Sequence, residues 1–331
     1  FPTQSGDLLL INDGRQITAL EHDTFSPRWS ITPGDTMDIV PKSDDPFAFY
    51  TAGRAIEDPA SVSVSTYPRA NVAVAVTGIA RNGRRTGDGR AHGIDVDSGR
   101  VLWSVEPQLL GPGYEGSSIR GPAVIENDTV VLAVRKQGQG ARDTTVLLLG
   151  LDLYTGKERW SRTLGVVGRL PWQVAQRRAD AITLHDGIAY YTDEIGVAAA
   201  VEATTGRAQW VRRLPTAGSF NARSFGRGET FPPHSIHAPI FHAGKLFILD
   251  AAEADRQRVL QLNAATGEIT AARDATAFGR PRYLIRVGEH LAAIGENRVA
   301  FVRLTDFASG TISATPSLVP PTNTSDGTII G

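Results

Sequence analysis

Four short segments of the chain concentrate side chains that could recognise a ligand. Arginine offers paired hydrogen-bond donors, histidine a titratable ring, and tryptophan and tyrosine large flat contact areas. Together they suit an anionic or planar ligand, or a peptide of a partner protein. The segments are Ser117 to Arg120, Trp172-Gln173, His234 to His237 and Arg280 to Tyr283, with Arg120, Trp172, Gln173, His234, His237, Arg282 and Tyr283 as the candidate binding residues.

Three of the seven histidines lie close together in the sequence, at His234, His237 and His242. A zinc centre needs three or four such ligands on one tetrahedral site. His242 falls in a predicted hairpin turn before Gly244, away from the strand entrance that carries His237. We therefore predict no metal site.

A repeated motif organises the elements that must position these side chains. It is a short polar turn that ends in glycine, followed four residues later by tryptophan. Asp, Asn, Ser and Thr bond their own backbone in such turns, and glycine supplies the positive φ of a tight hairpin. The three clean copies run from Asp95 through Gly99 to Trp103, from Asp152 through Gly156 to Trp160, and from Glu202 through Gly206 to Trp210.

Three degenerate copies extend the repeat over most of the chain. They run from Glu21 through Phe25 to Trp29, from Asn263 through Gly267 to Ala271, and from Asp306 through Gly310 to Ala314. Successive turns lie 43 to 74 residues apart, which brackets the length of a four-stranded sheet repeat. The sequence therefore predicts six recognisable repeats.

A second hairpin precedes the turn in several repeats, so each repeat contains four strands. Its clearest copies are Pro122 to Leu132, Ile182 to Tyr191 and Pro239 to Leu249. We predict an all-β protein, a β-propeller of four-stranded antiparallel blades in one domain over residues 1–331.

Blade number and chain context stay open in the sequence. We expect the first blade to begin with Asp7 to Asn12 as its second strand and to lack its innermost strand. A further blade between Thr36 and Ile56, or ring closure by the sequence after Gly310, would give seven or eight blades. The chain could also be a segment of a longer protein.

The run Asp-Ala-x-Thr-Gly followed by a strand ending in Trp resembles the PQQ-enzyme-like (quinoprotein-type) β-propeller repeat family. The resemblance covers residues 8 to 314, and the repeat is similar to that of the propeller lipoprotein of the outer-membrane β-barrel assembly machinery. It implies that glycine and tryptophan lock neighbouring blades together. The residues given this structural role are Trp29, Gly99, Trp103, Gly156, Trp160, Gly206, Trp210 and Gly267.

The resemblance raises the question of pyrroloquinoline quinone (PQQ) chemistry. A quinoprotein dehydrogenase holds PQQ, commonly with calcium and a carboxylate base, and many of these enzymes place a vicinal disulfide against the quinone. This chain has no cysteine, and Asp95, Asp97 and Asp152 are assigned to turns. We expect no bound cofactor, with PQQ as the alternative.

The function that follows is a noncatalytic binding or scaffolding propeller, with protein partners held by loops and the channel mouth. One alternative is a quinone-dependent dehydrogenase remnant. Another is a propeller-type polysaccharide lyase with His237 as base, Tyr283 as acid and Arg120 as charge neutraliser. A third is a ligand-sensing domain of a larger protein.

Composition bears on partners and compartment. Lys plus Arg number 34 against 35 Asp plus Glu, so a net charge of -1 gives no field that would attract nucleic acid. No apolar run approaches the roughly 20 residues of a membrane helix, so we expect no integral membrane segment. The chain starts at Phe1 without an initiator Met or a signal peptide. We expect an extracytoplasmic protein, periplasmic or secreted.

Overall fold

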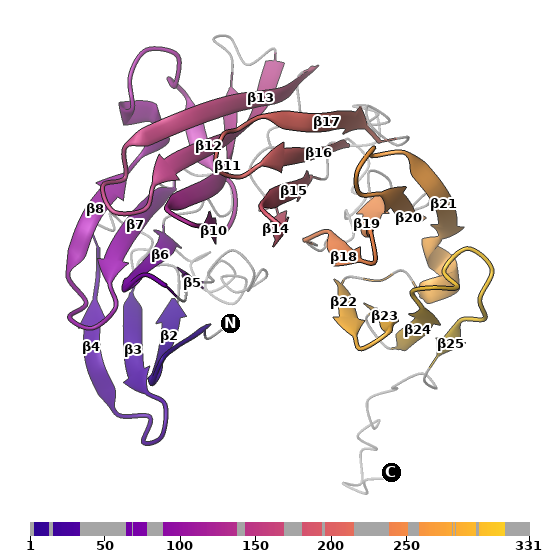
Figure 1. Cartoon of the computed structure of the whole chain (residues 1–331), viewed down its shortest axis with the longest axis horizontal. Coiled ribbons are helices and arrows are strands. Elements are labelled where there is room, and N and C mark those ends of the chain that lie inside the picture. The colour runs from indigo at the N-terminus through magenta and orange to yellow at the C-terminus, as the bar shows by residue number, and fades with distance from the viewer. Residues whose placement is uncertain are drawn as a thin grey trace, which may run out of the picture.

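The computed structural model of the protein contains six antiparallel sheets, which follow one another around an arc (Figure 1). It describes residues 3–12, 16–33, 64–67, 69–77, 89–137, 143–168, 181–193, 196–214, 238–250, 258–279, 281, 283–295 and 298–314. Within these residues, no helix is long and apolar enough to cross a membrane. The predicted all-β propeller of four-stranded blades is confirmed.

The first three sheets, blades 1 to 3, occupy the indigo to magenta part of Figure 1. They consist of β1 (Thr3–Ser5), β2 (Leu8–Asn12), β3 (Ile17–Glu21) and β4 (Pro27–Ile31) in blade 1, β5 (Val64–Thr66), β6 (Val72–Thr77), β7 (Arg90–Asp95) and β8 (Val101–Val105) in blade 2, and β10 (Val124–Glu126), β11 (Thr129–Gln137), β12 (Asp143–Asp152) and β13 (Glu158–Gly168) in blade 3, where β9 (Ser117–Ile119) also pairs with β11.

Blades 4 to 6 continue the arc toward its yellow end. They consist of β14 (Ala181–His185), β15 (Ile188–Thr192), β16 (Val197–Glu202) and β17 (Ala208–Arg213) in blade 4, β18 (Ile240–His242), β19 (Lys245–Asp250), β20 (Arg258–Asn263) and β21 (Ile269–Asp274) in blade 5, and β22 (Tyr283–Val287), β23 (His290–Ile294), β24 (Val299–Arg303) and β25 (Ser313–Ala314) in blade 6. Two 3₁₀ turns, η2 (Pro107–Leu109) and η5 (Ala275–Phe278), follow β8 and β21.

The expectation that blade 1 lacks its innermost strand is wrong. Thr3–Ser5 forms β1 and pairs with Leu8 to Leu10 of β2. This strand is only three residues long, and nothing apolar marks it in the sequence. The proposed extra blade between Thr36 and Ile56, and the sequence after Ala314, lie outside the described residues.

The core lies in the seams between successive blades. In β16 the alternate residues Val197, Ala199 and Val201 pack toward blade 3, whereas Ala198 and Ala200 pack toward blade 5. A middle strand is therefore buried on both faces, which explains its continuous apolar sequence. Five such seams join blades 1 to 6 in order, and the innermost strands of successive blades lie side by side.

Tryptophan locks four of these seams. The ring of Trp103 in blade 2 lies over Gly156 in the turn of blade 3, and its Nε1 donates to the carbonyl of Leu153 at 2.7 Å. A Cβ at Gly156 would sit 2.8 Å from the ring, so only glycine fits there. The same arrangement joins Trp29 to Gly99, Trp160 to Gly206 and Trp210 to Gly267, with Nε1 bonds of 2.8, 3.1 and 2.8 Å to the carbonyls of Val96, Ala203 and Ala264.

The fifth seam, between blades 5 and 6, uses arginine instead. Ala271 stands where tryptophan is expected, and Gln261 faces it in the position that Gly93 and Gly150 hold opposite their tryptophans. Arg273 Nη1 donates to the carbonyls of Phe307 at 3.2 Å and Gly310 at 2.8 Å. Its guanidinium lies 5.7 Å from the centre of the Phe278 ring. Arginine therefore supplies the lock that the degenerate repeat lacks.

Candidate functional site

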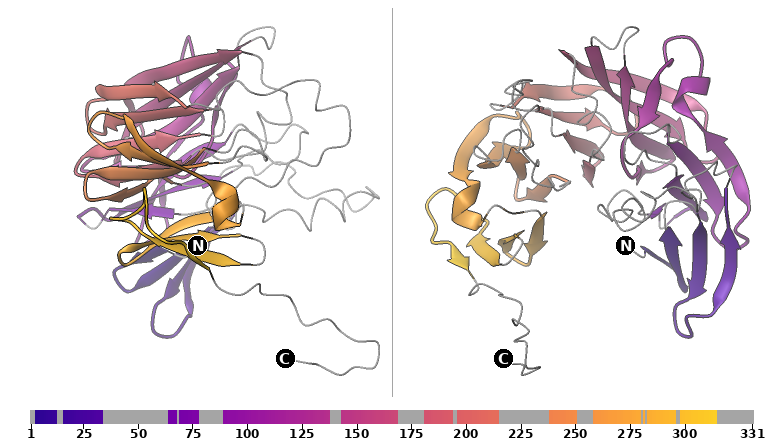
Figure 2. Two further views of the ribbon diagram at one scale, coloured as in Figure 1. Left: turned by 90° about the vertical axis from the view of Figure 1, so that its right-hand side faces the viewer. Right: turned by 180° about the vertical axis from the view of Figure 1, so that it is seen from behind.

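The strand order gives the propeller two faces with different contents. The first, here called the turn face, carries the connections between first and second strands and between third and fourth strands of each blade. The opposite, loop face carries the connections from each blade to the next. Figure 2 shows the sheets edge-on between these two faces. The loop-face connections run between Ile31 and Val64, Val105 and Ser117, Gly168 and Ala181, Arg213 and Ile240, and Asp274 and Tyr283.

Most residues predicted to bind a ligand fall on those connections but outside the described residues. These are Trp172, Gln173, His234, His237 and Arg282. Tyr283 begins β22, and its side chain is not described. Arg120 is described: it lies between β9 and β10, its side chain is enclosed at 2% exposure, and its backbone N–H donates to Ala133 at 2.9 Å. The structure therefore does not bring the seven residues together as one described site.

His242, the third predicted histidine, ends β18 on the turn face and pairs with Glu289 of blade 6 at 3.3 Å. Within the described part of the chain, no three His, Asp or Glu side chains form a group that could hold a metal ion.

Carboxylates with lowered pKa values lie mainly in the repeated turns. The Ser98 hydroxyl and backbone N–H, at 2.6 and 2.9 Å, lower the pKa of Asp95. Partial burial alone would raise the pKa of Asp152, but bonds from Arg159 and Thr155 outweigh it and lower the pKa. Both carboxylates thus stabilise turns.

One titratable side chain is fully buried inside blade 2. His92 on β7 lies between the Thr77 hydroxyl, at 2.9 Å from Nε2, and the Ser104 hydroxyl, at 2.8 Å from Nδ1. Burial, together with the smaller effect of the nearby Arg90 cation, lowers the pKa of His92 to about 4. The ring is therefore neutral at pH 7 and connects three strands.

This burial predicts an acid-sensitive contribution to stability. The unfolded chain binds a proton at His92 below pH 6.5, whereas the folded chain binds it only near pH 4, so the contribution is lost as the pH falls through this window. At about 1.4 kcal/mol per pKa unit, the loss reaches about 3 kcal/mol. Urea unfolding between pH 7 and pH 4 should show a shallower pH dependence for His92→Gln than for the wild type.

A matched change at the exposed His290 serves as the control, since His290→Gln should keep the wild-type pH dependence. Equal pH dependence in the wild type and His92→Gln would contradict the prediction.

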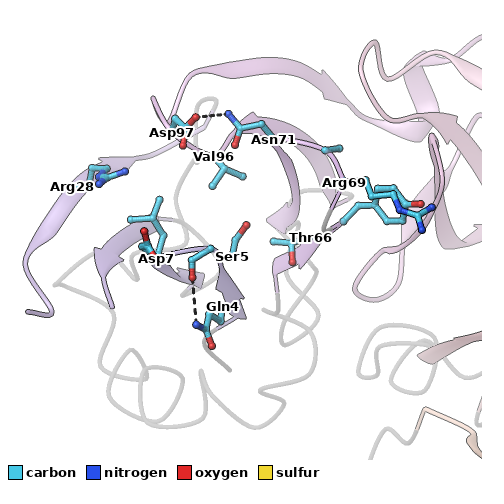
Figure 3. A pocket seen from close by; sticks show the side chains of 13 residues that line it. Gln4, Ser5, Asp7, Arg28, Thr66, Arg69, Asn71, Val96 and Asp97 are labelled. Carbon is cyan, nitrogen blue, oxygen red and sulfur yellow. Dashed lines mark hydrogen bonds between the residues drawn. The ribbon is translucent and has the colours of Figure 1, made fainter. Parts of the chain in front are cut away.

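A polar pocket of about 780 Å³ opens on the turn face between blades 1 and 2 (Figure 3). One wall is formed by Gln4 and Ser5 of β1 and by Asp7 in the turn that follows; Thr66 at the end of β5 lies opposite. Asn71 and Asp97 form one end, where the amide donates to the carboxylate at 2.7 Å.

Two arginines flank the pocket. Arg28 is held by Glu21 at 2.6 Å, whereas nothing among the described residues bonds the Arg69 guanidinium. The hydroxyl of Tyr67, two residues before Arg69, donates to the side-chain oxygen of Asn127 in blade 3 at 3.1 Å. The pocket thus offers carboxylates, amides, hydroxyls and guanidinium groups to a ligand.

Sequence reasoning missed this pocket, although a signal for it exists. The inner turns of five blades are tight two-residue connections, such as Asn127-Asp128 and Ala243-Gly244, whereas blade 2 connects β5 to β6 through residues 67–71. Aligning the repeats on their inner turns, rather than on the tryptophan turn, would have exposed this longer segment.

Comparisons with known proteins agree on the fold. The family model PQQ_2, described as outer membrane protein assembly factor BamB, matches residues 1–273. No curated protein sequence gives a significant match.

Three solved structures illustrate the likeness. The quinohemoprotein alcohol dehydrogenase ADHIIG from Pseudomonas putida HK5 is 10% identical with a TM-score of 0.55, covering 91% of this chain and 56% of that chain. BamB from Moraxella catarrhalis is 15% identical with a TM-score of 0.42, covering 95% and 84%. The quinohemoprotein alcohol dehydrogenase from Comamonas testosteroni is 13% identical with a TM-score of 0.48, covering 82% and 42%. The chain thus spans about half the length of the two alcohol dehydrogenases. The likeness to the Pseudomonas putida enzyme shows a shared fold alone.

Proposed function

The chain belongs to the family described as outer membrane protein assembly factor BamB, and from this premise we propose that it is a noncatalytic scaffold whose loop face and channel mouth bind a protein partner. The same membership supports a location outside the cytoplasm.

The observation that carries the proposal is that the seams hold the blades together while the connections between blades all lie on the loop face. Five seams are fixed by side chains that reach from one blade into the next, so the blades form a rigid support. The connections between blades all leave this support on one face. Binding residues commonly lie on loops held by such scaffolds. Leu109, in the connection from blade 2 to blade 3, exposes 76% of its surface on this face and is therefore accessible to a partner.

Site-specific photo-crosslinking in the native cell tests this proposal. A photoreactive residue at Leu109 on the loop face should yield a discrete adduct, identified by mass spectrometry. The same residue at Tyr154, 49% exposed in the turn of blade 3 on the turn face, is the matched control and should yield none. An adduct of equal intensity at both positions, or none at Leu109, would reject the loop face as the binding surface.

We also propose that the protein works without PQQ. Asp95, Asp152 and Asp274 do not fit a calcium and quinone site, because their carboxylates accept hydrogen bonds within their own turns. No three His, Asp or Glu side chains among the described residues form a group that could hold a metal ion. Asp250 is 2% exposed and lies 3.6 Å from Arg258. Titration with PQQ and Ca²⁺ should give no saturable quenching of tryptophan fluorescence. Saturable quenching together with alcohol oxidation would establish the dehydrogenase alternative.

A further inference from the structure

The pocket between blades 1 and 2 exists because one repeat departs from the pattern. The backbone carbonyls of Asp7, Asn71 and Asp128 accept equivalent bonds from His22, Val96 and Leu153, so these three positions correspond in blades 1, 2 and 3. Between blades 1 and 2 the longer connection 67–71 adds Arg69 and Tyr67 beside the short β1–β2 turn. Tyr67 packs against the core between blades 2 and 3, whereas Arg69 makes no such contact among the described residues.

The charges around the pocket cancel. Arg28 and Arg69 stand against Asp7 and Asp97, and all four side chains are exposed to water. Water screens charges in this setting, so an ion pair with a ligand would contribute little. The pocket therefore has no net preference for an anion or a cation.

The walls of the pocket carry several hydrogen-bonding side chains. Ser5 and Thr66 carry hydroxyls that both donate and accept, Gln4 carries an amide, and Asp7 carries a carboxylate that nothing among the described residues bonds (Figure 3). A sugar ring presents hydroxyls that likewise donate and accept. Tyr67 adds an aromatic side chain whose hydroxyl is already fixed by Asn127. The volume of about 780 Å³ is in the range of small-molecule sites.

We infer that this pocket binds a neutral saccharide, with the Asp7 carboxylate and the Ser5 and Thr66 hydroxyls as the main hydrogen-bonding groups for its hydroxyls. The site lies on the face opposite the proposed partner surface. It stands independently of the proposed scaffold function, and either could fail alone.

Isothermal titration calorimetry of the full chain with maltotriose, cellotriose and chitotriose tests the inference. At least one trisaccharide should bind at a single site. Asp7→Ala should weaken that binding by about tenfold, as expected for the loss of a well-placed hydrogen bond. The Asp7 side chain is exposed, and nothing among the described residues bonds it, so the melting temperature should not change.

Asp128→Ala provides the matched control, because Asp128 occupies the position of Asp7 in blade 3 but lies outside the pocket. It should leave saccharide binding unchanged. The inference is overturned if none of the three trisaccharides binds at about 10 mM, or if Asp7→Ala and Asp128→Ala have equal effects. It is also overturned if the mixed-charge tripeptide Asp-Gly-Lys binds in the pocket and the sugars do not.

Discussion

Trp103→Ala is expected to lower the free energy of unfolding by about 4 to 5 kcal/mol, the upper part of the range for buried aromatic truncation. Trp103 is 7% exposed and packs against Gly93 of its own blade and Gly156 of the next. Its removal opens a cavity in the seam between blades 2 and 3. It also leaves the carbonyl of Leu153 without its donor. Urea unfolding followed by far-ultraviolet circular dichroism measures the change.

The variant Trp103→Phe separates the two contributions. Phenylalanine keeps most of the ring contact but cannot donate to Leu153, so it should cost about 1 to 2 kcal/mol. If both substitutions cost less than about 1 kcal/mol, the tryptophan does not lock the seam.

Gly206→Ala is expected to cost about 3 kcal/mol or more, because it combines backbone strain with overpacking. Gly206 has φ +71°, and an added Cβ would lie 2.5 Å from the Trp160 ring. Either the ring or the turn must shift, and the bond from Trp160 to Ala203 would weaken with it. Thermal and urea unfolding of the variant measure the cost.

Gly187→Ala in the same blade is the matched control. Gly187 has φ +75°, but nothing lies within 4 Å of the position its Cβ would take. This variant should show the backbone cost alone, about 1 to 2 kcal/mol. Equal costs for the two alanines would mean that contact with Trp160 contributes nothing to the requirement for glycine.

The repeated turn explains how far the sequence predicts the fold. Its polar residues act within a few positions of one another: Asp152 bonds Thr155, and the Gly156 N–H bonds the Asp152 carbonyl at 2.9 Å. Such local chemistry is readable in a linear sequence, and the spacing of the turns then predicts the blades. The hairpin from Ile182 to Tyr191, for example, is β14 and β15.

The seam between blades 5 and 6 shows what a linear pattern leaves out. Arg273 reaches the same carbonyl position that tryptophan uses elsewhere, but it stands two residues later in the strand, and Gln261 fills the space opposite Ala271. This exchange is visible only when both strands and the next blade are seen together. The pocket was missed for the same reason, since Asp7 and Arg69 are far apart in the chain.

The seven candidate binding residues are harder to predict from local sequence. The sequence groups them only by residue type and by their position before the innermost strands. Arg120 is the one whose side chain the structure describes, and it is enclosed. Side-chain burial follows from packing with several segments at once, and a single sequence does not encode that directly.

Among the described residues, each lock connects a blade to the one that follows it, so a mechanical load passes from blade to blade along the arc. A force that separates the first sheet from the last must cross all five links in series. The strength of the array is then that of its weakest link.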